Sequence, residues 1–396
     1  PPPPPPPPSL MTRRPPRSTP ADCRRQRQMC IRDRPSVTPD DAGCQQLICE
    51  RLLPLGFDVE WFLCGEVSNV LFTRGRGSPS LWFLGHTDVV PSGPEELWTF
   101  LPFHPDEKDG ELYGRGVADM KGGVAAMVVA LESFVAANPD HGGEVGLLLT
   151  SDEEGVAIDG ITRVAEEMKR RGHRPDFCLV GEPSSQVTLG DTIRVGRRGS
   201  IYLKLTVNGI QGHAAFPENL DNPVHRIAPF LTDLVNQEWD QGDAEFPASH
   251  CQVSSLRAGT GAGNVTPANI ELLVNFRNGP GSPARAIQAR IDELLIKHDI
   301  DDYDLEWQIM GEPFRSEPGK LREAVVSAVE DVLGVYPDLN TGGGTSDGRY
   351  IAPLGTEVLE LCLLNTSIHQ IDERTPIHDL DRLQETYLDV LNRLYL

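Results

Sequence analysis

The sequence contains no run of 18 or more apolar residues, the length that a helix needs to cross a bilayer, so a membrane protein is not expected. Basic residues are also scarce, because 36 lysines and arginines face 58 aspartates and glutamates, a formal net charge of −22. Nucleic acid is bound through basic surfaces, so it is not expected as a partner. A small anionic substrate is compatible with this charge, since a few well-placed arginines suffice to bind one.

Cysteine pairs with CxxC spacing are missing, and so is the apolar stretch of a secretory signal near the N-terminus. Without either feature, a reduced cytoplasmic protein is the simplest expectation. Each thiol is then expected to pack as a small apolar side chain. Six of the eight cysteines lie beyond residue 34, at Cys44, Cys49, Cys64, Cys178, Cys251 and Cys362.

Residues 1–34 differ from the rest of the chain in composition. Eight prolines open them, and eight arginines follow with only Asp22 and Asp33 in opposition, a local net charge of +8 − 2 = +6. Neither a period of 2 nor one of 3.6 occurs there, so we expect this segment to be disordered and dispensable. A basic arm and a transit peptide are two interpretations. We favour a third, in which the segment from Thr12 is translated sequencing adaptor and the genuine fold starts near Pro35.

The region between residues 44 and 182 alternates helical patterns with short apolar strands. With 396 residues, 39% hydrophobic and 24% charged, the whole chain is typical of a globular protein with two domains. Val145–Leu149 is a continuous apolar run, as in a sheet covered by helices on both faces. We therefore expect an α/β domain whose site lies at the carboxyl ends of its strands. The expected strands are 58–62, 70–73, 81–84, 144–150 and 176–180, and the expected helices are 45–55, 121–137 and 158–171.

Residues 199–311 follow a different order, in which four strands and two helices are arranged as β-α-β-β-α-β. This is the order of a small α+β layer with its helices on one face of an antiparallel sheet. Helices expected at 323–333 and 381–394 then return the chain to the first domain. We therefore expect an inserted domain at 199–311 and a first domain formed by 35–198 and 312–396. The strands of the insertion are expected at 201–207, 251–257, 270–276 and 305–310, and its helices at 222–236 and 283–298.

A histidine and several carboxylates stand where predicted strands or turns end. The strand at 81–84 is followed by His86 and Asp88, whose i, i+2 spacing points both side chains the same way. Asp88 can then lie behind His86, fix its tautomer and raise its basicity. Such a pair alone is more often plain structure, but further acidic residues follow. The imidazole-and-carboxylate set that a pair of hydrolytic zinc ions needs is completed by Asp119, Glu153, Glu154 and Glu182.

Nine stretches carry a family resemblance over residues 35–396. The first four are His86-Thr87-Asp88, Gly114–Gly123, Asp152-Glu153-Glu154-Gly155 and Gly181-Glu182-Pro183. They resemble the dinuclear-zinc amidohydrolases and exopeptidases, a family that includes aminoacylases and glutamate carboxypeptidases. The other five are Gly196–Ser200, Gly212–Pro217, Asn264–Pro267, Thr341–Arg349 and Leu364–His369. They are most similar to the branch of the family that removes a succinyl group from N-succinyl-LL-diaminopimelate.

The resemblance implies a zinc-exopeptidase-like fold and a ligand role for five residues. Asp119 would bridge two Zn²⁺ ions, one of which Co²⁺ could replace. One ion would be held by His86 and Glu182, and the other by Glu154 and His369. A cis peptide bond directly after Asp119 is implied as well.

Two further residues would take part in the reaction. Glu153 cannot point at the same metal as Glu154 in an extended chain, so it is the expected general base, although the pair alone would equally be an acidic surface turn. In the family, the histidine that corresponds to His213 reaches the site from a partner subunit and stabilises the oxyanion. We therefore expect a homodimer formed through the inserted domain, which would also serve as a lid. A surface or core histidine is the other interpretation of His213.

The implied substrate is small and carries carboxylates at both ends, which guanidinium groups bind bidentately. The glycine run at 342–344 could bring main-chain N–H groups to a carboxylate, although such a run alone is more often a flexible loop. The candidate substrate-binding residues are Arg197, Arg198, Arg277, Arg349 and Gly343, with Ser200, Asn264, Thr345 and Asn365 as weaker polar candidates.

Two other functions are compatible with the same residues. Another deacylase of the family, such as an acetylornithine deacetylase or an aminoacylase-like enzyme, would differ in how it binds the acyl group of its substrate. A non-catalytic relative could keep the fold as a binding or dimer module. Loss of a metal ligand would favour that second alternative, and none of the implied ligands is missing from the sequence.

Overall fold

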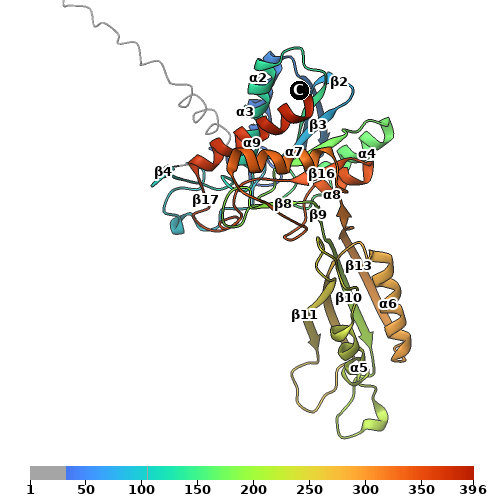
Figure 1. Cartoon of the computed structure of the whole chain (residues 1–396). Coiled ribbons are helices and arrows are strands. Elements are labelled where there is room, and N and C mark those ends of the chain that lie inside the picture. The colour runs from blue at the N-terminus through green and yellow to red at the C-terminus, as the bar shows by residue number, and fades with distance from the viewer. Residues whose placement is uncertain (1–32, 105) are drawn as a thin grey trace, which may run out of the picture.

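The computed structural model describes residues 33–104 and 106–396 (Figure 1). The disorder expected for residues 1–34 therefore falls almost wholly outside the described residues. Arg34 is described, and it packs against the fold: its Nη1 donates to the main-chain oxygen of Ala42 at 2.8 Å, and its own main-chain oxygen accepts from Lys121 Nζ at 2.7 Å. Among the described helices, none is long and apolar enough to cross a membrane.

The larger part of the molecule is built on an eight-stranded mixed sheet with the order β1-β2-β6-β3-β7-β16-β8-β15. Its centre is parallel, since β3 pairs in parallel with both β6 and β7, and β7 pairs in parallel with β16. The carboxyl ends of these strands therefore meet at one edge of the sheet. The strands are β1 (Asp58–Cys64), β2 (Val67–Arg76), β3 (Ser80–His86), β6 (Gly143–Thr150), β7 (Phe177–Val180), β8 (Thr192–Arg194), β15 (Asp338–Asn340) and β16 (Glu357–Glu360).

Helices cover both faces of this sheet, as the apolar strands predict. Successive residues of a strand point to opposite faces, so Leu81 and Phe83 join one hydrophobic cluster while Trp82 and Leu84 join another. The first cluster contains residues of α2 (Cys44–Leu52), α3 (Lys121–Ala137), α7 (Lys320–Ala328) and α9 (Ile377–Tyr395). The second contains residues of α4 (Ile161–Arg171) and α8 (Gly348–Ile351).

Most predicted elements of this part are present, with small shifts at their ends. Helix α3 has the predicted bounds, and α2 continues as a 3₁₀ turn, η1 (Leu53–Leu55), to the predicted stop at Gly56, which has the left-handed φ of 83°. Helix α9 starts four residues earlier than predicted, and α7 ends in a π-helical turn, η4 (Val329–Leu333). Short elements that were not predicted are β4 (Asp106–Lys108), β5 (Glu111–Tyr113), β8, β9 (Gly196–Arg197), β14 (Phe314–Arg315), β15, β16, β17 (Arg374–Pro376), α8, η2 (Glu95–Leu97) and η5 (Ala352–Leu354).

The smaller part extends away from the large sheet as an elongated arm (Figure 1). It is an antiparallel sheet of order β11-β12-β10-β13 with the predicted β-α-β-β-α-β sequence. Alternate residues of β10 are buried with α5 and α6 in a hydrophobic cluster of its own, so both helices lie on one face. Its elements are β10 (Gly199–Asn208), η3 (Pro217–Asn219), α5 (Pro223–Asn236), β11 (His250–Ala258), β12 (Asn269–Asn278), α6 (Ala284–Lys297) and β13 (Tyr303–Gly311).

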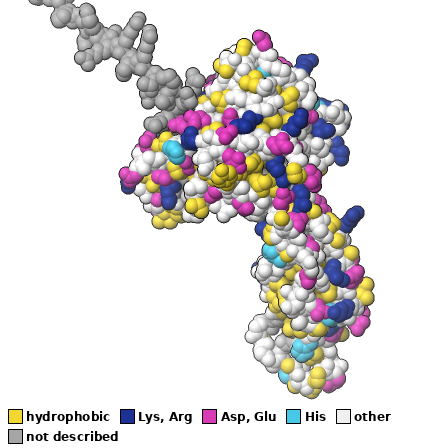
Figure 2. Space-filling model, in the orientation of Figure 1, with side chains coloured by type: hydrophobic (Ala, Val, Ile, Leu, Met, Phe, Trp, Pro, Cys, Tyr) yellow, Lys and Arg dark blue, Asp and Glu magenta, His cyan; other side chains and the backbone are white. Residues whose placement is uncertain are grey.

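The chain enters and leaves the arm through two strands that pair with each other. β9 precedes the arm and β14 follows it, and they are antiparallel, with Arg197 opposite Phe314. On the face of the molecule seen in Figure 2, lysine and arginine side chains are interspersed with acidic ones over both parts of the described chain. That face therefore presents no continuous basic surface.

Candidate metal centre

His86 ends β3, and its imidazole is almost completely buried. Its Nδ1 lies 2.9 Å from the main-chain oxygen of Asp88. Because a carbonyl oxygen can only accept, Nδ1 carries the proton in this contact, and the lone pair of Nε2 is directed into the site. The sequence suggested that the Asp88 carboxylate would fix the tautomer of His86, but that carboxylate is 3.7 Å from Nδ1.

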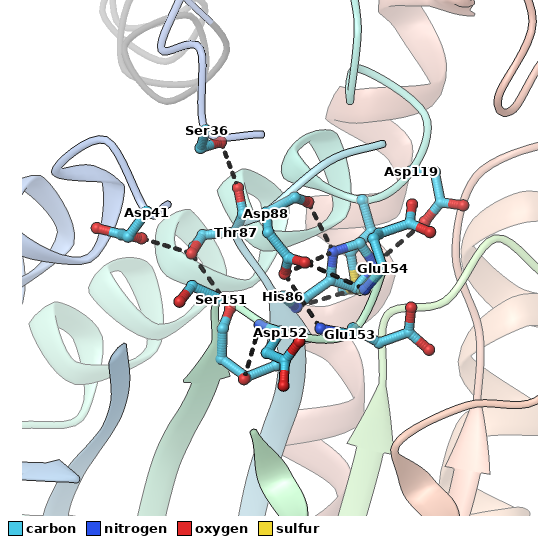
Figure 3. A network of polar contacts seen from close by, with 12 residues as sticks. Ser36, Asp41, His86, Thr87, Asp88, Asp119, Ser151, Asp152, Glu153 and Glu154 are labelled. Atoms are coloured by element: carbon cyan, nitrogen blue, oxygen red, sulfur yellow. Dashed lines mark hydrogen bonds and ion pairs between the residues drawn. The ribbon is translucent and has the colours of Figure 1, made fainter. Parts of the chain in front are cut away.

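The Asp88 carboxylate has a different partner, the turn that carries the acidic pair (Figure 3). Its two oxygens accept hydrogen bonds from the main-chain nitrogens of Glu153 at 3.4 Å and Glu154 at 3.1 Å. Asp88 therefore joins the end of β3 to the turn after β6. The residue was placed correctly beside His86, but its carboxylate orients the acidic turn and its carbonyl orients the imidazole.

Asp119 lies between two imidazoles. Its Oδ1 is 3.3 Å from Nε2 of His86, and its Oδ2 is 3.4 Å from Nε2 of His369. Glu182 Oε1 is 3.6 Å from the first imidazole, and Glu154 Oε1 is 2.9 Å from the second. Each imidazole thus faces one oxygen of Asp119 and one glutamate, in the two groups that the resemblance implied. The peptide bond after Asp119 is cis, as the resemblance also implied.

The atoms around Asp119 fit divalent cations. Nε2 of His86 and Oδ1 of Asp119 are buried, and neither has a hydrogen-bond partner among the described residues. The donor atoms of His86, Asp119 and Glu154 lie within 4.8 Å of one another, and so do those of His86, Glu153 and Glu182. Imidazole nitrogen and carboxylate oxygen are ligands that zinc prefers in hydrolytic sites. Glu153 belongs to the second group, so geometry alone allows it to be a ligand as well as a base.

The ionisation of these groups follows from their crowding. Burial lowers the pKa of His86, but the carboxylates of Asp119, Glu182 and Asp88 together raise it well above its ordinary value. Hydrogen bonds to Asp119 and Glu154 raise the pKa of His369 to about 10. A metal ion would compete with these protons, because a ligating histidine must be neutral.

Glu153 and Glu182, the two glutamates near His86, have pKa values well above the ordinary range. Burial is the main cause for both, and neighbouring carboxylates, among them Asp119, add to it. Burial would raise the pKa of Asp119 as well, but its contacts with the imidazoles of His369 and His86 hold that pKa below its usual value. A carboxyl group with a raised pKa is suited to exchange a proton near neutral pH, which a general base must do.

Glu373 is a buried residue of this centre that the sequence did not reveal. Its carboxylate accepts four hydrogen bonds from the loop before α3: from Arg115 Nη1 at 2.7 Å, and from the main-chain nitrogens of Gly116, Ala118 and Asp119 at 3.1, 2.9 and 3.1 Å. It therefore holds the backbone that presents Asp119. No local pattern marks Glu373, because its partners lie more than 250 positions away in the sequence.

Arg197, expected to bind a substrate carboxylate, already has a carboxylate partner. Its Nε donates to Glu360 Oε2 at 2.7 Å, and its Nη1 donates to the main-chain oxygens of Gly342 and Gly344 at 3.1 and 3.3 Å. Ser346 Oγ donates to the other oxygen of Glu360 at 2.5 Å. Arg197 thus fixes the glycine loop, and the sequence gave no sign of Glu360.

The other expected substrate-binding residues are divided between the two parts. Ser200 and Arg277 are opposite each other on β10 and β12, at the end of the arm nearest the large sheet. Arg349 Nε and Nη1 are buried without a hydrogen-bond partner among the described residues. Gly343 is exposed with a φ of 91° in the loop that Arg197 holds. Thr345 and Asn365 are partly buried, in the segments that lead to α8 and to His369.

His213 and Asn264 lie together, but not at the metal centre of their own chain. Both are exposed, and they are neighbours because the main-chain nitrogen of Ala214 donates to the oxygen of Asn264 at 3.0 Å. Their loops adjoin η3, which lies at the end of the arm that points away from the large sheet (Figure 1). Within one chain, the structure therefore brings the proposed metal ligands and Glu153 together, whereas His213 and Asn264 lie away from them.

A buried imidazole, an exposed one and several carboxylates meet beside the carboxyl ends of parallel strands, an arrangement typical of a metal-dependent hydrolase. Comparison with known families agrees with this class. The chain belongs to the peptidase family M20/M25/M40, whose model matches residues 82–393.

Curated relatives are similar over most of the chain. A succinyl-diaminopimelate desuccinylase of Halorhodospira halophila is 51% identical over 361 residues, which cover 91% of this chain and 95% of the relative. A protein of the same name from Stenotrophomonas maltophilia is 50% identical over 361 residues, with coverage of 91% and 96%.

Solved structures share the fold at low identity. Aminopeptidase PepT from Bacillus cereus has a TM-score of 0.76 at 20% identity, covering 94% of this chain and 98% of that one. The YXEP protein of Bacillus subtilis, described as a dinuclear metal-binding peptidase of the M20 family, has a TM-score of 0.70 at 14% identity, with coverage of 94% and 98%.

Replacing Glu373 with Gln tests how the loop before α3 is held. The amide keeps one acceptor and turns the other into a donor, so at least one of the four donors loses its partner inside the protein. We expect the free energy of unfolding to fall by about 1–3 kcal/mol, the usual cost of an unsatisfied buried polar group. Urea unfolding of the metal-free protein measures this change in the free energy of unfolding. Glu323→Gln, the same change at an exposed position of α7, is the control, and equal effects of the two would contradict this role.

Proposed function

We propose that this protein hydrolyses N-succinyl-LL-2,6-diaminopimelate to succinate and LL-2,6-diaminopimelate, a step towards lysine and the cell wall. Relatives about half identical over nine tenths of the chain carry the name of this desuccinylase. The observation that carries the chemistry is the position of Asp119, which faces one imidazole with each of its oxygens.

Two Zn²⁺ ions are the proposed cofactors, with Co²⁺ able to replace one of them. His86 and Glu182 would hold one ion, His369 and Glu154 the other, and Asp119 would bridge them. The unpartnered Nε2 of His86 and Oδ1 of Asp119 support this assignment, since a ligand nitrogen and oxygen need free lone pairs. Bound here, the ions would polarise the scissile carbonyl and lower the pKa of a water molecule between them.

Glu153 is the proposed general base. It takes a proton from the attacking water as the new C–O bond forms at the amide carbon, and it gives that proton to the leaving nitrogen as the C–N bond breaks. Succinate leaves as a carboxylate and diaminopimelate as an amine. The main-chain hydrogen bond from Glu153 to Asp88 supports this role, because it fixes the turn on which the carboxyl stands.

The substrate carries carboxylates at both ends, and we propose Arg277 and Arg349 as the groups that read them. The two unpartnered nitrogens of Arg349 support its role. Arg197 acts more indirectly, by holding Gly343 and the rest of the glycine loop, because its guanidinium is engaged by Glu360. The remaining candidates for polar contacts with the substrate are Ser200, Asn264, Thr345 and Asn365, with Arg198 beside Arg277.

We propose further that residues 199–311 form a dimerisation and lid domain inserted between 35–198 and 312–396. The separate hydrophobic cluster of the arm supports this division. Both β11 and β13 are edge strands of its sheet, so either could pair with the same strand of a second copy. A homodimer of this kind would offer His213 to the partner's centre. For the location we propose the cytoplasm, where the succinylated substrate would be made.

The substrate is tested by an assay of the zinc-loaded protein. We expect kcat/KM for N-succinyl-LL-diaminopimelate to exceed that for the N-acetyl analogue and for N-acetylornithine, since only the succinyl group presents a carboxylate at the acyl end to an arginine. Faster turnover of an acetylated substrate would favour the other deacylases of the family. Hydrolysis of none of them by protein with its full metal content would favour a non-catalytic role.

The general base is tested by a matched pair of variants. Glu153→Gln should keep its two zinc ions while kcat falls by about 10²–10⁴, the contribution of general acid–base catalysis. Glu154→Gln makes the same change one residue later and should lose metal. Zinc content by atomic absorption and kcat are measured on both proteins. Equal loss of zinc from the two would make Glu153 a ligand, which its distance from His86 and Glu182 allows.

The role of His213 is tested by mixing two inactive proteins. A His213→Ala chain keeps Glu153, and a Glu153→Ala chain keeps His213. If the histidine acts across the dimer, one of the two sites in a mixed dimer is complete, and activity should return as subunits exchange. Exchange is followed with a fluorescent label on each chain. Exchange without recovery would mean that His213 acts within its own chain or not at all.

A further inference from the structure

The segment at residues 34–41 contacts the loops that carry the metal ligands. It runs beside the segment that follows His86, as a parallel bridge between Val37 and Val89. The main-chain nitrogen of Val89 donates to the oxygen of Ser36 at 2.8 Å, and the nitrogen of Thr38 donates to the oxygen of Val89 at 3.0 Å. This bridge lies outside the eight-stranded sheet, so the sheet does not account for it.

Two side chains of this segment hold Thr87, the residue between His86 and Asp88. Ser36 Oγ donates to the main-chain oxygen of Thr87 at 2.6 Å, and both residues are completely buried. Thr87 Oγ1 donates to Asp41 Oδ1 at 2.5 Å (Figure 3). The main chain and the side chain of Thr87 are thus both fixed. The peptide between Thr87 and Asp88, whose oxygen Ser36 binds, also sets the direction of Asp88, whose carbonyl orients the imidazole.

The same segment reaches the other two ligand-bearing loops. Ser151, which stands two residues before Glu153, donates from Oγ to the main-chain oxygen of Pro39 at 2.9 Å. Lys121 stands two residues after Asp119, and its completely buried Nζ donates to the main-chain oxygen of Arg34 at 2.7 Å. Within eight residues, the segment therefore binds next to a ligand of each proposed metal position and next to the bridging Asp119.

We propose that residues 34–41 act as a positioning segment for the metal centre, and that Ser36 and Asp41 are positioning residues that act through Thr87. This rests on the proposed metal centre and adds residues that touch neither metal nor substrate. Residues that hydrogen-bond to metal ligands or to the backbone beside them commonly change the metal affinity of a site by about 10–100-fold. The segment would have this effect by holding His86, Asp119 and the acidic turn in one arrangement before metal binds.

The test measures metal binding by the full chain. Ser36→Ala removes the hydrogen bond to the Thr87 oxygen, and Asp41→Ala removes the acceptor for the Thr87 hydroxyl. Asp41→Asn is a milder change that keeps the shape of the side chain. Asp40→Ala is the matched control: it removes an exposed carboxylate from the next position, whose described contact is with the main-chain nitrogen of Ala42. Zinc affinity is measured on metal-free protein by competition with a chelator.

We expect Ser36→Ala and the Asp41 variants to bind Zn²⁺ about 10-fold or more weakly than wild type, because each loses a hydrogen bond that holds the backbone beside a ligand. Asp40→Ala should bind Zn²⁺ with the affinity of wild type. The visible absorption of bound Co²⁺, which depends on ligand geometry, should shift in the Ser36 and Asp41 variants. Affinities and Co²⁺ spectra that match Asp40→Ala in folded variants would overturn the proposal. Failure of wild type to bind zinc would instead overturn the metal centre, so the two results are distinct.

Discussion

The crowding of carboxylates around His86 is the constraint on which the rest of this structure depends. Donor atoms of His86, Glu153 and Glu182 lie within 4.8 Å of one another, and Asp119 is in contact with the same imidazole. Bringing like charges together away from water is unfavourable unless cations compensate them. The raised pKa values of Glu153 and Glu182 express that cost in the protein without metal. Two divalent cations would remove it, so the charges that oppose folding are the charges that bind metal.

Because these groups repel one another, their loops must be held by contacts from outside the cluster. Glu373 holds the loop of Asp119, Asp88 holds the acidic turn, and Ser36 holds the peptide after Thr87. Each of these contacts involves at least one main-chain atom. Main-chain contacts fix the position of a loop without requiring a particular side chain there, which leaves the ligand side chains free to face the metal positions.

The sequence predicted most of the large sheet because its strands are apolar and its helices have clear ends. Helix α3 was predicted with its observed bounds, since Lys121–Ala137 is almost uniformly apolar and is followed by polar residues. Strand β16 was not predicted, although it lies inside the sheet between β7 and β8. It has only four residues, two of them glutamates, and its place is set by pairing with strands far away in the sequence.

At the site, motifs predicted the residues that the structure brings together around Asp119, and they did not predict the residues that support them. A motif records residues that are neighbours in the chain, such as His86 and Asp88. Glu373 and Glu360 meet partners 258 and 163 positions away, so locally each resembles an ordinary acidic surface residue. Arg197 was assigned to the substrate for the same reason, because the carboxylate that engages it is not visible in its own stretch of sequence.

The junction between the two parts shows why the position of Arg197 matters. The arm starts directly after Arg197, whose strand β9 pairs with β14 on the way back. Its guanidinium is tied to Glu360 at the end of β16 and to the glycine loop. The movement proposed for the arm would therefore take place beyond β9 and β14 and would leave the glycine loop fixed to the large sheet. Ser200 and Arg277 lie in the arm, so the proposed closure would change their distance from the metal centre while Gly343 would keep its own. A substrate long enough to touch both sides can then hold the arm closed, which couples recognition of the substrate's far end to assembly of the site.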